Sequence, residues 1–360
     1  MPRDLTVWPR GHKSPVAIRL LGLCALSALA LACRAAPPAA EAQAPPVTIV
    51  DTVVDTGAFA SPEACERAPA FYAVVGTLRV GSLNVRWFPH GHARPHPEEA
   101  GTDLVWLACL VAKSGFDVLA VQEFQQGPDG REALAQVLDS LEARTGQRFS
   151  ARLDECPEDG RQHVGFLWNN ARVALDEFHQ VDDVNPLGGC RGRLRPGLEA
   201  RARFQHGPEL RLLTLHLDSG RMGRDFDHRQ ESFVRLRAWA ARPLGDAAGA
   251  LILGDFNTMG CDRCEIPEDG ESEVASLDTV LPGRLPLPEG AQCSEYYRGH
   301  AGLIDHAVFV PRAGGVRAEL SVLGPCASRH CGHAPASDAY LTRVSDHCPL
   351  LVRLTTDAAR

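Results

Sequence analysis

The chain has 360 residues, of which 44% are hydrophobic and 23% charged, a balance typical of a globular protein with a full core. This composition excludes disorder along the whole chain. The only long apolar run, Leu20 to Ala32, is too short to span a bilayer, which excludes a polytopic membrane protein. The net charge of −8 lacks the strongly basic character of tight nucleic-acid binders.

The first 33 residues have the layout of an export signal. Four basic residues precede the apolar run, which ends at Ala32-Cys33, as in a secretory signal peptide. The ending Ala-Leu-Ala-Cys resembles a bacterial lipoprotein cleavage box, with Ala30 where leucine is usual, and implies that Cys33 is acylated. The alternative is ordinary cleavage nearby. We therefore expect an exported bacterial protein, either a periplasmic or outer-membrane lipoprotein or a secreted protein.

The rest of the chain divides into two parts. Residues 34–70 begin with a Pro/Ala-rich stretch and show no sustained period, so we predict a linker. Residues 71–356 are predicted to form the catalytic domain. Residues 1–33 hold four basic residues and one acidic residue, so the mature chain has a charge near −11. A polyanionic substrate must then be held by a few aimed groups or by metal ions.

Ten cysteines follow Cys33, and an even number in an exported chain indicates disulfides. Spacing does not give their pairing, although Cys326 and Cys331 are a candidate local pair. A zinc site is the alternative, with Cys261 and Cys264 joined by cysteines or histidines between residues 326 and 333. An oxidising compartment favours disulfides over four free thiolates.

From residue 78 onward, short apolar runs alternate with helical patterns. The elements predicted in chain order are a strand at Leu78–Val85, a helix at Asp103–Lys113, a strand at Phe116–Val121, a helix at Gly130–Thr145, strands at Val164–Trp168, Val173–Phe178, Leu198–Phe204 and Leu210–Leu217, a helix at Asp227–Ala241, and strands at Ala250–Gly254, Leu303–Val310 and Cys348–Leu354. Residues 260–302 are predicted to be loop with one short helix. This mixture predicts a packed α/β sandwich rather than a purely parallel sheet.

Polar side chains follow or interrupt five of the apolar runs. They are Asn84, Glu123, His216, the pair Asp255 and Asn257, and the pair Asp346 and His347. A single residue of this kind is usually a cap or a turn residue of an ordinary α/β domain. Several carboxylate and amide oxygens at one rim of a sheet would instead make a site suited to Mg²⁺ or Mn²⁺.

The order of these motifs resembles the endonuclease/exonuclease/phosphatase superfamily, the group of pancreatic deoxyribonuclease. Leu-Asn, Gln-Glu, apolar-His, Gly-Asp-Phe-Asn, Ile-Asp-His and Ser-Asp-His follow one another between Leu78 and Leu354. The spacing of Gly-Asp-Phe-Asn and Ser-Asp-His is the most specific part. The resemblance implies a four-layer α/β sandwich, in which two mixed β-sheets pack face to face with helices outside and the site at one rim.

The resemblance also implies roles for individual residues. Metal binding is implied for Asn84, Glu123 and Asp346. Catalytic roles are implied for His216, Asp255, Asn257, Asp305 and His347. Weaker positional matches suggest substrate binding by Arg161, His163, Arg195 and Arg201. The arginines could equally be surface residues, because the chain has only two lysines and arginine is its usual base.

We therefore expect a Mg²⁺-dependent (or Mn²⁺-dependent) phosphodiester hydrolase, most simply a nuclease of low sequence specificity acting outside the cytoplasm. In the segment His216-Leu217-Asp218-Ser219-Gly220, Asp218 replaces the lysine of similar secreted nucleases, which removes a positive charge beside the site. A phospholipid (sphingomyelinase-like) hydrolase or a small phosphodiester or phosphomonoester hydrolase is the alternative enzyme. A catalytically silent surface-binding protein with the same fold is the alternative from another class.

Overall fold

The computed structural model describes residues 56–69, 76–92, 101–157, 161–288, 293–297, 300–312, 316–328 and 338–356. Contacts divide the chain into residues 1–48 and 49–360, and every described residue belongs to the second unit. The predicted signal peptide, Cys33 and the first part of the predicted linker lie outside the described residues. Within the described ranges, we find no helix long and apolar enough to cross a membrane.

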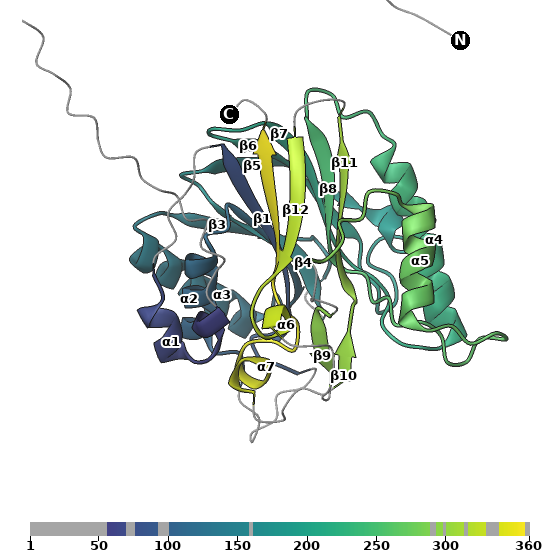
Figure 1. The fold of residues 1–360 in the computed structure, drawn as a ribbon, viewed down its shortest axis with the longest axis horizontal. Helices are drawn as coiled ribbons and strands as arrows, with labels where there is room; N and C mark the ends of the chain where they lie inside the picture. The colour runs from purple at the N-terminus through teal and green to yellow at the C-terminus, as the bar shows by residue number, and fades with distance from the viewer. Residues whose placement is uncertain are drawn as a thin grey trace, which may run out of the picture. The chain divides into compact units, whose positions relative to one another are not determined.

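Two mixed β-sheets form the centre of the molecule (Figure 1). The first runs in the order β12 (Val316–Val322), β13 (Leu350–Thr356), β1 (Thr77–Phe88), β2 (Val118–Phe124), β4 (His163–Asn169) and β3 (Phe149–Leu153). The second runs in the order β11 (Asp305–Pro311), β8 (Gly249–Asp255), β7 (Glu209–His216), β6 (Gly197–Phe204) and β5 (Val173–Val181). Among the described strands, only β1/β2 and β7/β8 pair in parallel. Most strands predicted from the sequence are therefore confirmed.

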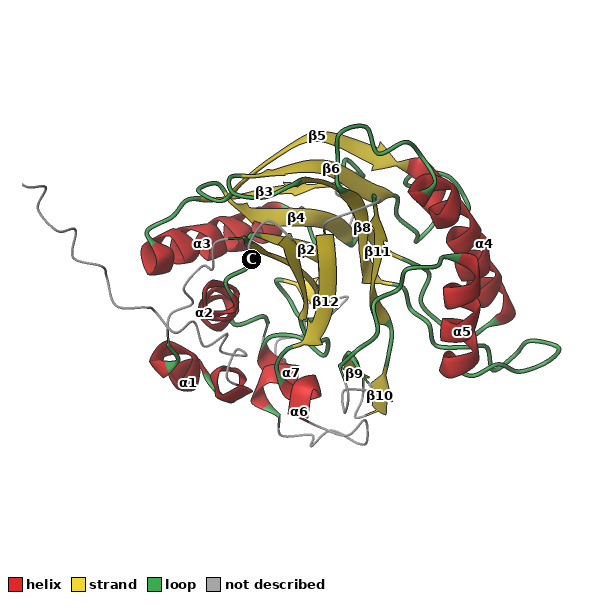
Figure 2. Cartoon of the chain, turned by 45° about the horizontal axis from the view of Figure 1, so that its top comes forward, coloured by secondary structure: helices red, strands yellow, loops and turns green. Residues whose placement is uncertain are grey.

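The sheets face each other and helices cover their outer faces (Figure 2). The helices are η1 (Thr56–Phe59), α1 (Pro62–Arg67), α2 (Leu104–Ser114), α3 (Pro128–Thr145), η2 (Asp182–Val184), α4 (Gly223–Ala240), α5 (Gly270–Val280), α6 (Pro325–Ser328) and α7 (Ala339–Arg343). Helices α1 to α3 lie outside the first sheet, and α4 and α5 lie outside the second. The short strands β9 (Glu295–Tyr297) and β10 (His300–Gly302) form a separate antiparallel pair outside the two main sheets. The predicted four-layer sandwich is confirmed.

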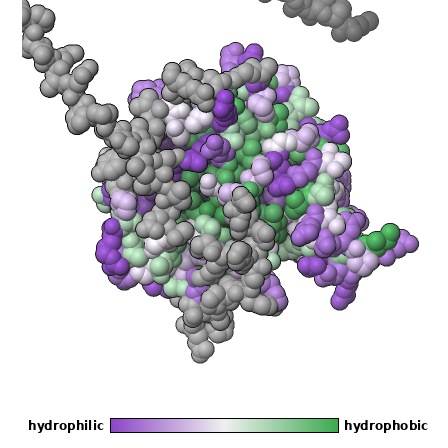
Figure 3. All heavy atoms as spheres, viewed as in Figure 1, coloured by the Kyte–Doolittle hydropathy of each residue, from purple (hydrophilic) through white to green (hydrophobic). Residues whose placement is uncertain are grey.

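Burial of apolar side chains explains the central strands. Every residue of β8 is buried, which suits a strand covered on both faces. Each buried leucine or valine side chain contributes about 1.5–3 kcal/mol relative to exposure. Figure 3 shows hydrophobic residues gathered in the middle of the face where the edge strands β11 and β12 lie, with hydrophilic residues around them. The apolar layer between the sheets thus reaches this open side.

The strand register brings the polar strand ends together. His216 at the end of β7 is paired with Asp255 at the end of β8, and Asp255 is also paired with Asp305 at the start of β11. In the first sheet, Asn84 of β1 is paired with Gln122 of β2. Because the two parallel pairs end at the same rim of the sandwich, residues far apart in the sequence meet there.

Several elements differ from the sequence predictions. Residues 56–69, assigned above to the linker, form η1 and α1, and Cys65 of α1 is bonded to Cys109 of α2. The one short helix predicted within residues 260–302 is confirmed as α5, whereas the strands β9 and β10 of the same region were not predicted. Strands β3 and β12 were not predicted. Both lie at sheet edges, where alternating exposure gives a weaker apolar signal.

The disulfides correct two expectations from the cysteine pattern. Cys326 is bonded to Cys348, so the suggested pair with Cys331 is wrong. Cys261 is bonded to Cys264, which rules out these two as zinc thiolates. A further bond joins Cys156 to Cys190. Cys331 itself lies outside the described residues.

Candidate active site

The polar strand ends predicted from the sequence lie together at one rim. Glu123, His216 and Asp255 offer potential ligand atoms within 4.8 Å of one another, and so do Asp255, Asp305 and His347. Asp255 belongs to both groups and is buried. These residues come from five different segments of the chain, which is the convergence expected of an active site rather than of separate helix caps.

The backbone is irregular where Glu123 enters the site. The pairing of β2 with β4 shifts between Val121 and Phe124, and Glu123 has a φ of 66°. Such a bulge re-aims a side chain at the end of a strand. A left-handed conformation at a non-glycine residue costs about 1–3 kcal/mol and occurs mainly at functional sites. Trp87, whose φ is 48°, donates its backbone N–H to Glu123 Oε2 at 2.9 Å and holds the carboxylate in place.

Asn84 connects two of the carboxylates. Its Nδ2 donates to Glu123 Oε1 at 3.0 Å and to Asp255 Oδ2 at 2.9 Å. The Ser345 hydroxyl donates to the backbone carbonyl of Asn84 at 2.6 Å, and the same hydroxyl accepts from the backbone N–H of His347 at 3.1 Å. The turn that carries Asp346 and His347 is thereby fixed to the end of β1.

His347 and Asp305 form a hydrogen-bonded pair. His347 Nδ1 lies 2.8 Å from Asp305 Oδ2, so this nitrogen donates to the carboxylate. His347 Nε2 lies 3.8 Å from Asp255 Oδ2, too far for a hydrogen bond, and faces the rim. Burial lowers the pKa of His347, but the charge and hydrogen bond of Asp305 outweigh it and raise the pKa well above its ordinary value. The ring is therefore an imidazolium at neutral pH.

His216 has the opposite protonation state. Its Nδ1 contacts an Nη of Arg195, and a guanidinium can only donate, so Nδ1 accepts and the proton is on Nε2. That Nε2 lies 3.4 Å from Asp255 Oδ2 and 3.8 Å from Glu123 Oε1. Burial, followed by the charge of Arg195, holds the pKa of His216 well below its ordinary value. The site thus combines a charged and a neutral histidine on either side of Asp255.

Asp255 is placed to act as a base near neutral pH. Burial, followed by the charge of Asp305, raises the pKa of Asp255 to about 7. Its Oδ1 accepts from the backbone N–H of Asn257 at 2.9 Å. Asn257 has a φ of 53°, and its side-chain Nδ2 donates to the carbonyl of Leu217 at 3.1 Å. The Asp-Phe-Asn turn therefore orients both polar side chains toward the rim.

Glu295 is a site residue that the sequence reasoning missed. It forms an isolated bridge with His347 across the start of the β9–β10 hairpin, and it is buried. Burial, chiefly, raises its pKa to about 8. It escaped notice because it lies in the region predicted to be loop. No apolar run before it marked a strand end, and only the pairing of β9 with the His347 turn reveals it.

The carboxylates fit a divalent cation. Asp346 Oδ1 is buried and has no hydrogen-bond partner within the described residues. Burial also raises the pKa of Glu123, and the nearby charge of Asp346 raises it further. Carboxylate oxygens that lie close enough to repel one another, one of them without a hydrogen-bond partner, are the donor set that a hard cation such as Mg²⁺ or Mn²⁺ would satisfy. Glu123 and Asp346 would hold it, with Asp255 and His216 beside them. Asn84, also predicted as a ligand, instead accepts the N–H of Arg86 on its Oδ1 at 2.9 Å and positions the carboxylates through its Nδ2.

The four residues for which substrate binding was predicted on weaker grounds lie in different parts of the structure. Arg195 is buried against His216 and faces Glu123 and Asp255, so it supplies a positive charge at the rim. His163 is buried at the rim end of β4, where Nδ1 lies 2.8 Å from Asp154 Oδ1. Arg161 instead donates to the carbonyls of Cys190 and Gly192 in a loop. Arg201 pairs with Glu209 and Glu177 in the middle of β6, away from the strand ends that meet at the rim.

A neighbouring histidine should make the fold sensitive to acid. His306 is buried, its Nε2 bonds to Thr258 Oγ1 at 2.9 Å, and burial lowers its pKa to about 3. The unfolded chain therefore binds more protons than the folded chain between about pH 6.5 and 3. As the pH is lowered through this window, this group should reduce the free energy of unfolding by up to about 1.4 kcal/mol per pH unit. Urea titrations at pH 7, 5 and 4 measure it.

The variant His306→Gln should remove part of this pH dependence. The matched control is His206→Gln, which changes an exposed histidine and should leave the slope unchanged. Equal slopes for the wild type and His306→Gln would contradict the prediction.

Comparisons with known proteins agree with this architecture. The TDP2 of D. rerio in complex with a single-strand DNA product is 18% identical, with a TM-score of 0.53, and the match covers 78% of this chain and 99% of that chain. A humanised D. rerio TDP2 with 14 mutations is 18% identical, with a TM-score of 0.51 and coverage of 78% and 100%. A truncated Caenorhabditis elegans TDP2 is 16% identical, with a TM-score of 0.52 and coverage of 78% and 98%. These likenesses show the fold.

A search of curated proteins found no match. The model of the Endonuclease/Exonuclease/phosphatase family, however, matches residues 81–347, which span every polar strand end described above. The chain therefore belongs to the endonuclease/exonuclease/phosphatase family and is an enzyme that hydrolyses phosphate esters.

Proposed function

We propose that this protein is an exported, Mg²⁺-dependent phosphodiester hydrolase, most simply a nuclease of low sequence specificity. The observation that carries the proposal is the placement of Asp255 between His347 and His216, with Glu123 on the same rim. A bound divalent cation would supply charge neutralisation for the phosphate group. The proposal explains why several carboxylates are gathered at one rim and why Asp346 Oδ1 has no hydrogen-bond partner among the described residues.

Different side chains of the site can serve the different steps of phosphate ester hydrolysis. Asp255 can accept a proton from the attacking water, because its pKa is near neutral. The Nε2 of the His347 imidazolium and the Nε2–H of His216 can donate hydrogen bonds to charge that develops on phosphoryl oxygens. Arg195 adds a fixed positive charge behind His216. These local groups would allow an acidic protein to hold an anionic substrate.

Metal removal tests the proposal directly. Purified residues 34–360 should degrade DNA or RNA with Mg²⁺ and lose this activity on addition of EDTA, and added Mg²⁺ should restore it. A panel of DNA, RNA, sphingomyelin and bis(4-nitrophenyl) phosphate under one metal concentration identifies the substrate class. Full activity in EDTA would refute the role of the metal.

Export is part of the proposal and has a separate basis. The signal-like residues 1–33 and the disulfides of the domain support an oxidising compartment outside the cytoplasm. Attachment through a lipid on Cys33 is the form of export that the Ala-Leu-Ala-Cys sequence favours. Mass spectrometry of the mature N-terminus distinguishes an acylated Cys33 from ordinary cleavage.

A small phosphodiester or phospholipid is the second candidate substrate, and one observation favours it. The carboxylate of Asp218, which follows β7, lies 2.6 Å from the guanidinium of Arg193 and 2.8 Å from Nδ1 of His228. Asp218 therefore pairs with two nearby basic side chains. These bases are then less available to the extended backbone of a nucleic acid. In the panel, hydrolysis of bis(4-nitrophenyl) phosphate without cleavage of DNA or RNA would select this candidate.

A further inference from the structure

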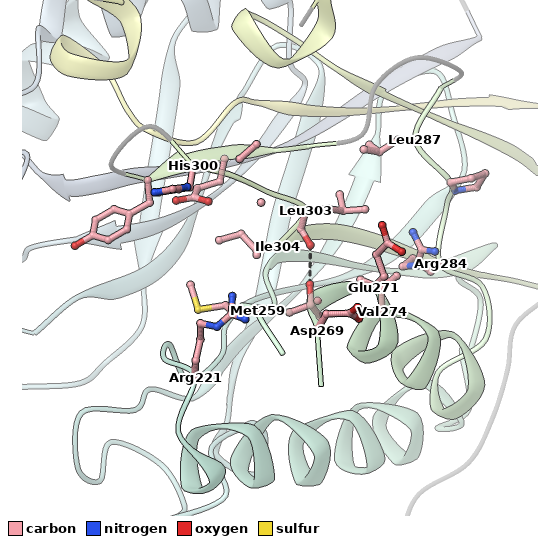
Figure 4. A pocket seen from close by; sticks show the side chains of 17 residues that line it. Arg221, Met259, Asp269, Glu271, Val274, Arg284, Leu287, His300, Leu303 and Ile304 are labelled. Carbon is pink, nitrogen blue, oxygen red and sulfur yellow. Dashed lines mark hydrogen bonds between the residues drawn. The ribbon is translucent and has the colours of Figure 1, made fainter. Parts of the chain in front are cut away.

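A cavity of about 1080 Å³ lies beside the candidate active site (Figure 4). Its walls are the first turn of α5, the β9–β10 hairpin, the segment of residues 284–287 and the loop that follows Asn257. Ligand pockets in proteins usually have volumes of about 300–1,000 Å³. The cavity is thus large enough for more than a phosphate group.

The cavity and the active site share a wall. Thr258 directly follows Asn257, and Ile304 directly precedes Asp305, and both line the cavity. Glu295 also lines it and is bridged to His347. A group bound in the cavity would therefore be adjacent to a phosphate held at His347.

The Glu295 carboxylate reaches the cavity wall from a residue that is nearly buried. The residue is 6% exposed, and the described part of the chain offers no hydrogen bond or ion pair to its carboxylate. A Cβ on Gly302 would lie 2.8 Å from Glu295 Oε2, so the glycine leaves room for the carboxylate. A carboxyl group at a cavity wall that has no partner among the described side chains is available to hydrogen-bond a ligand there.

The charges of the lining decide which ligand fits. Arg221 is paired with Asp262 at 2.7 Å, and Arg284 is paired through two bonds with Asp278 at 2.6 and 2.7 Å. Besides these paired arginines, the described lining holds His300 and Glu295, and two acidic side chains, Asp269 and Glu271, stand at the start of α5. Their charge disfavours a second phosphate group in the cavity, whereas carboxylates readily accept hydrogen bonds from hydroxyl groups.

Apolar groups complete the lining. Met259, Leu287, Ile304 and Leu303 contribute hydrophobic surface, and Tyr297 lines the cavity with a ring that is 52% exposed. Figure 4 shows Met259, Leu287 and Ile304 around the cavity with Asp269 and Glu271 on the α5 side. A ring that carries both C–H faces and hydroxyl groups matches this combination.

We propose that this cavity binds an uncharged, hydroxyl-bearing sugar ring that forms part of the phosphate ester cleaved at the candidate active site. The inference rests on the proposed hydrolase function and adds a specificity site to it. A nucleoside and a glycosyl group both supply such a ring, and the substrates below distinguish them. A nucleic-acid strand that would place a further phosphate in the cavity is disfavoured.

Four esters with the same 4-nitrophenol leaving group test the proposal. They are bis(4-nitrophenyl) phosphate, thymidine 5′-(4-nitrophenyl phosphate), its 3′-phosphorylated derivative and glucose 6-(4-nitrophenyl phosphate). Leu287→Trp should fill the cavity and lower kcat/KM for a sugar ester about tenfold while changing bis(4-nitrophenyl) phosphate hydrolysis less than about twofold. The sugar ester that responds identifies the source of the ring.

A charge reversal provides the second arm. Glu271→Lys should raise kcat/KM for the 3′-phosphorylated ester about tenfold, since it replaces repulsion by attraction. The matched control Glu132→Lys makes the same change on exposed α3, away from the cavity, and should have no selective effect. Because Glu271 is exposed, this variant remains informative even if Leu287→Trp fails to fold.

The outcomes separate the two proposals. If the wild type hydrolyses none of the four esters, the proposed function itself fails. If it hydrolyses bis(4-nitrophenyl) phosphate but Leu287→Trp and Glu271→Lys change all esters equally or not at all, the sugar site is wrong and the hydrolase proposal stands.

Discussion

Replacing His347 with glutamine should lower kcat by about 10²–10³-fold, the loss typical of removing one donor to charge that develops in the transition state. Glutamine keeps a polar group near the rim but cannot carry the imidazolium charge. The Nε2 of His347 is free to meet substrate, because its distances to Asp255 and Asp346 are 3.8 and 4.0 Å. Steady-state kinetics on bis(4-nitrophenyl) phosphate, with far-UV circular dichroism as a check of folding, measure the effect.

Asp305 should act through His347, and the pH profile can show it. The carboxylate raises the pKa of His347, so the imidazolium persists to a pH well above its ordinary value. Activity that needs the imidazolium is present below the folded-state pKa and is lost as pH rises through it. Asp305→Asn should therefore move this alkaline limb to lower pH as well as lower kcat.

An exposed histidine provides the control for both variants. His206→Gln changes an exposed histidine and should leave both kcat and the pH profile intact. Because Asp305 and His347 act as a unit, the double variant should be little worse than His347→Gln alone. Additive losses, or an unshifted profile in Asp305→Asn, would contradict the assigned pair.

Loss of the buried guanidinium at position 229 should destabilise the fold by about 3–5 kcal/mol, the cost of leaving a buried charge without its partner. Arg229 on α4 is fully buried and bonds to Glu273 on α5 through two hydrogen bonds of 2.7 and 2.8 Å. It also donates to the carbonyls of Asp218, Gly220 and Gly260. All five donors of the guanidinium are thus used, and two loops beside the site are held by one side chain.

Arg229→Leu should therefore lower the free energy of unfolding by about 3–5 kcal/mol, measured by equilibrium unfolding in guanidinium chloride. Arg229→Leu combined with Glu273→Leu should be less destabilised than Arg229→Leu, because no charge is then stranded. Arg203→Leu removes an exposed arginine that pairs with Glu177, and it should cost at most about 1 kcal/mol. An effect of Arg229→Leu as small as that of Arg203→Leu would disprove the role of the pair.

The sequence predicted most of this site because its residues sit at the ends of buried strands. Gly-Asp-Phe-Asn begins within the last two residues of the entirely buried strand β8, and Ser-Asp-His precedes the largely buried strand β13, so the polar residues stand out against apolar neighbours. The register of parallel strands then gathers them at one rim. Their roles remain predictions, since proximity establishes a site and only kinetics establishes what each residue does.

Other features have no sequence signal of this kind. Glu295 reaches the site through a three-residue strand, which is too short to show a period. The bond between Cys326 and Cys348 depends on how α6 packs beside the His347 turn, and spacing along the chain favoured a nearer cysteine. Arg161 and Arg201 were suggested by position alone. Arg161 bonds to the backbone of the loop that holds Cys190, and ion pairs hold Arg201 on β6.

Three of the disulfides lie in the loops of the rim rather than in the sandwich. Cys348 directly follows His347, Cys261 follows the Asn257 turn, and Cys190 lies in the loop that leads to Arg195. The strands are held by apolar burial, which does not depend on redox conditions. A chain made in a reducing cytosol should therefore assemble its layers yet leave the catalytic loops loosely organised, so that hydrolytic capacity matures only after the thiols are oxidised.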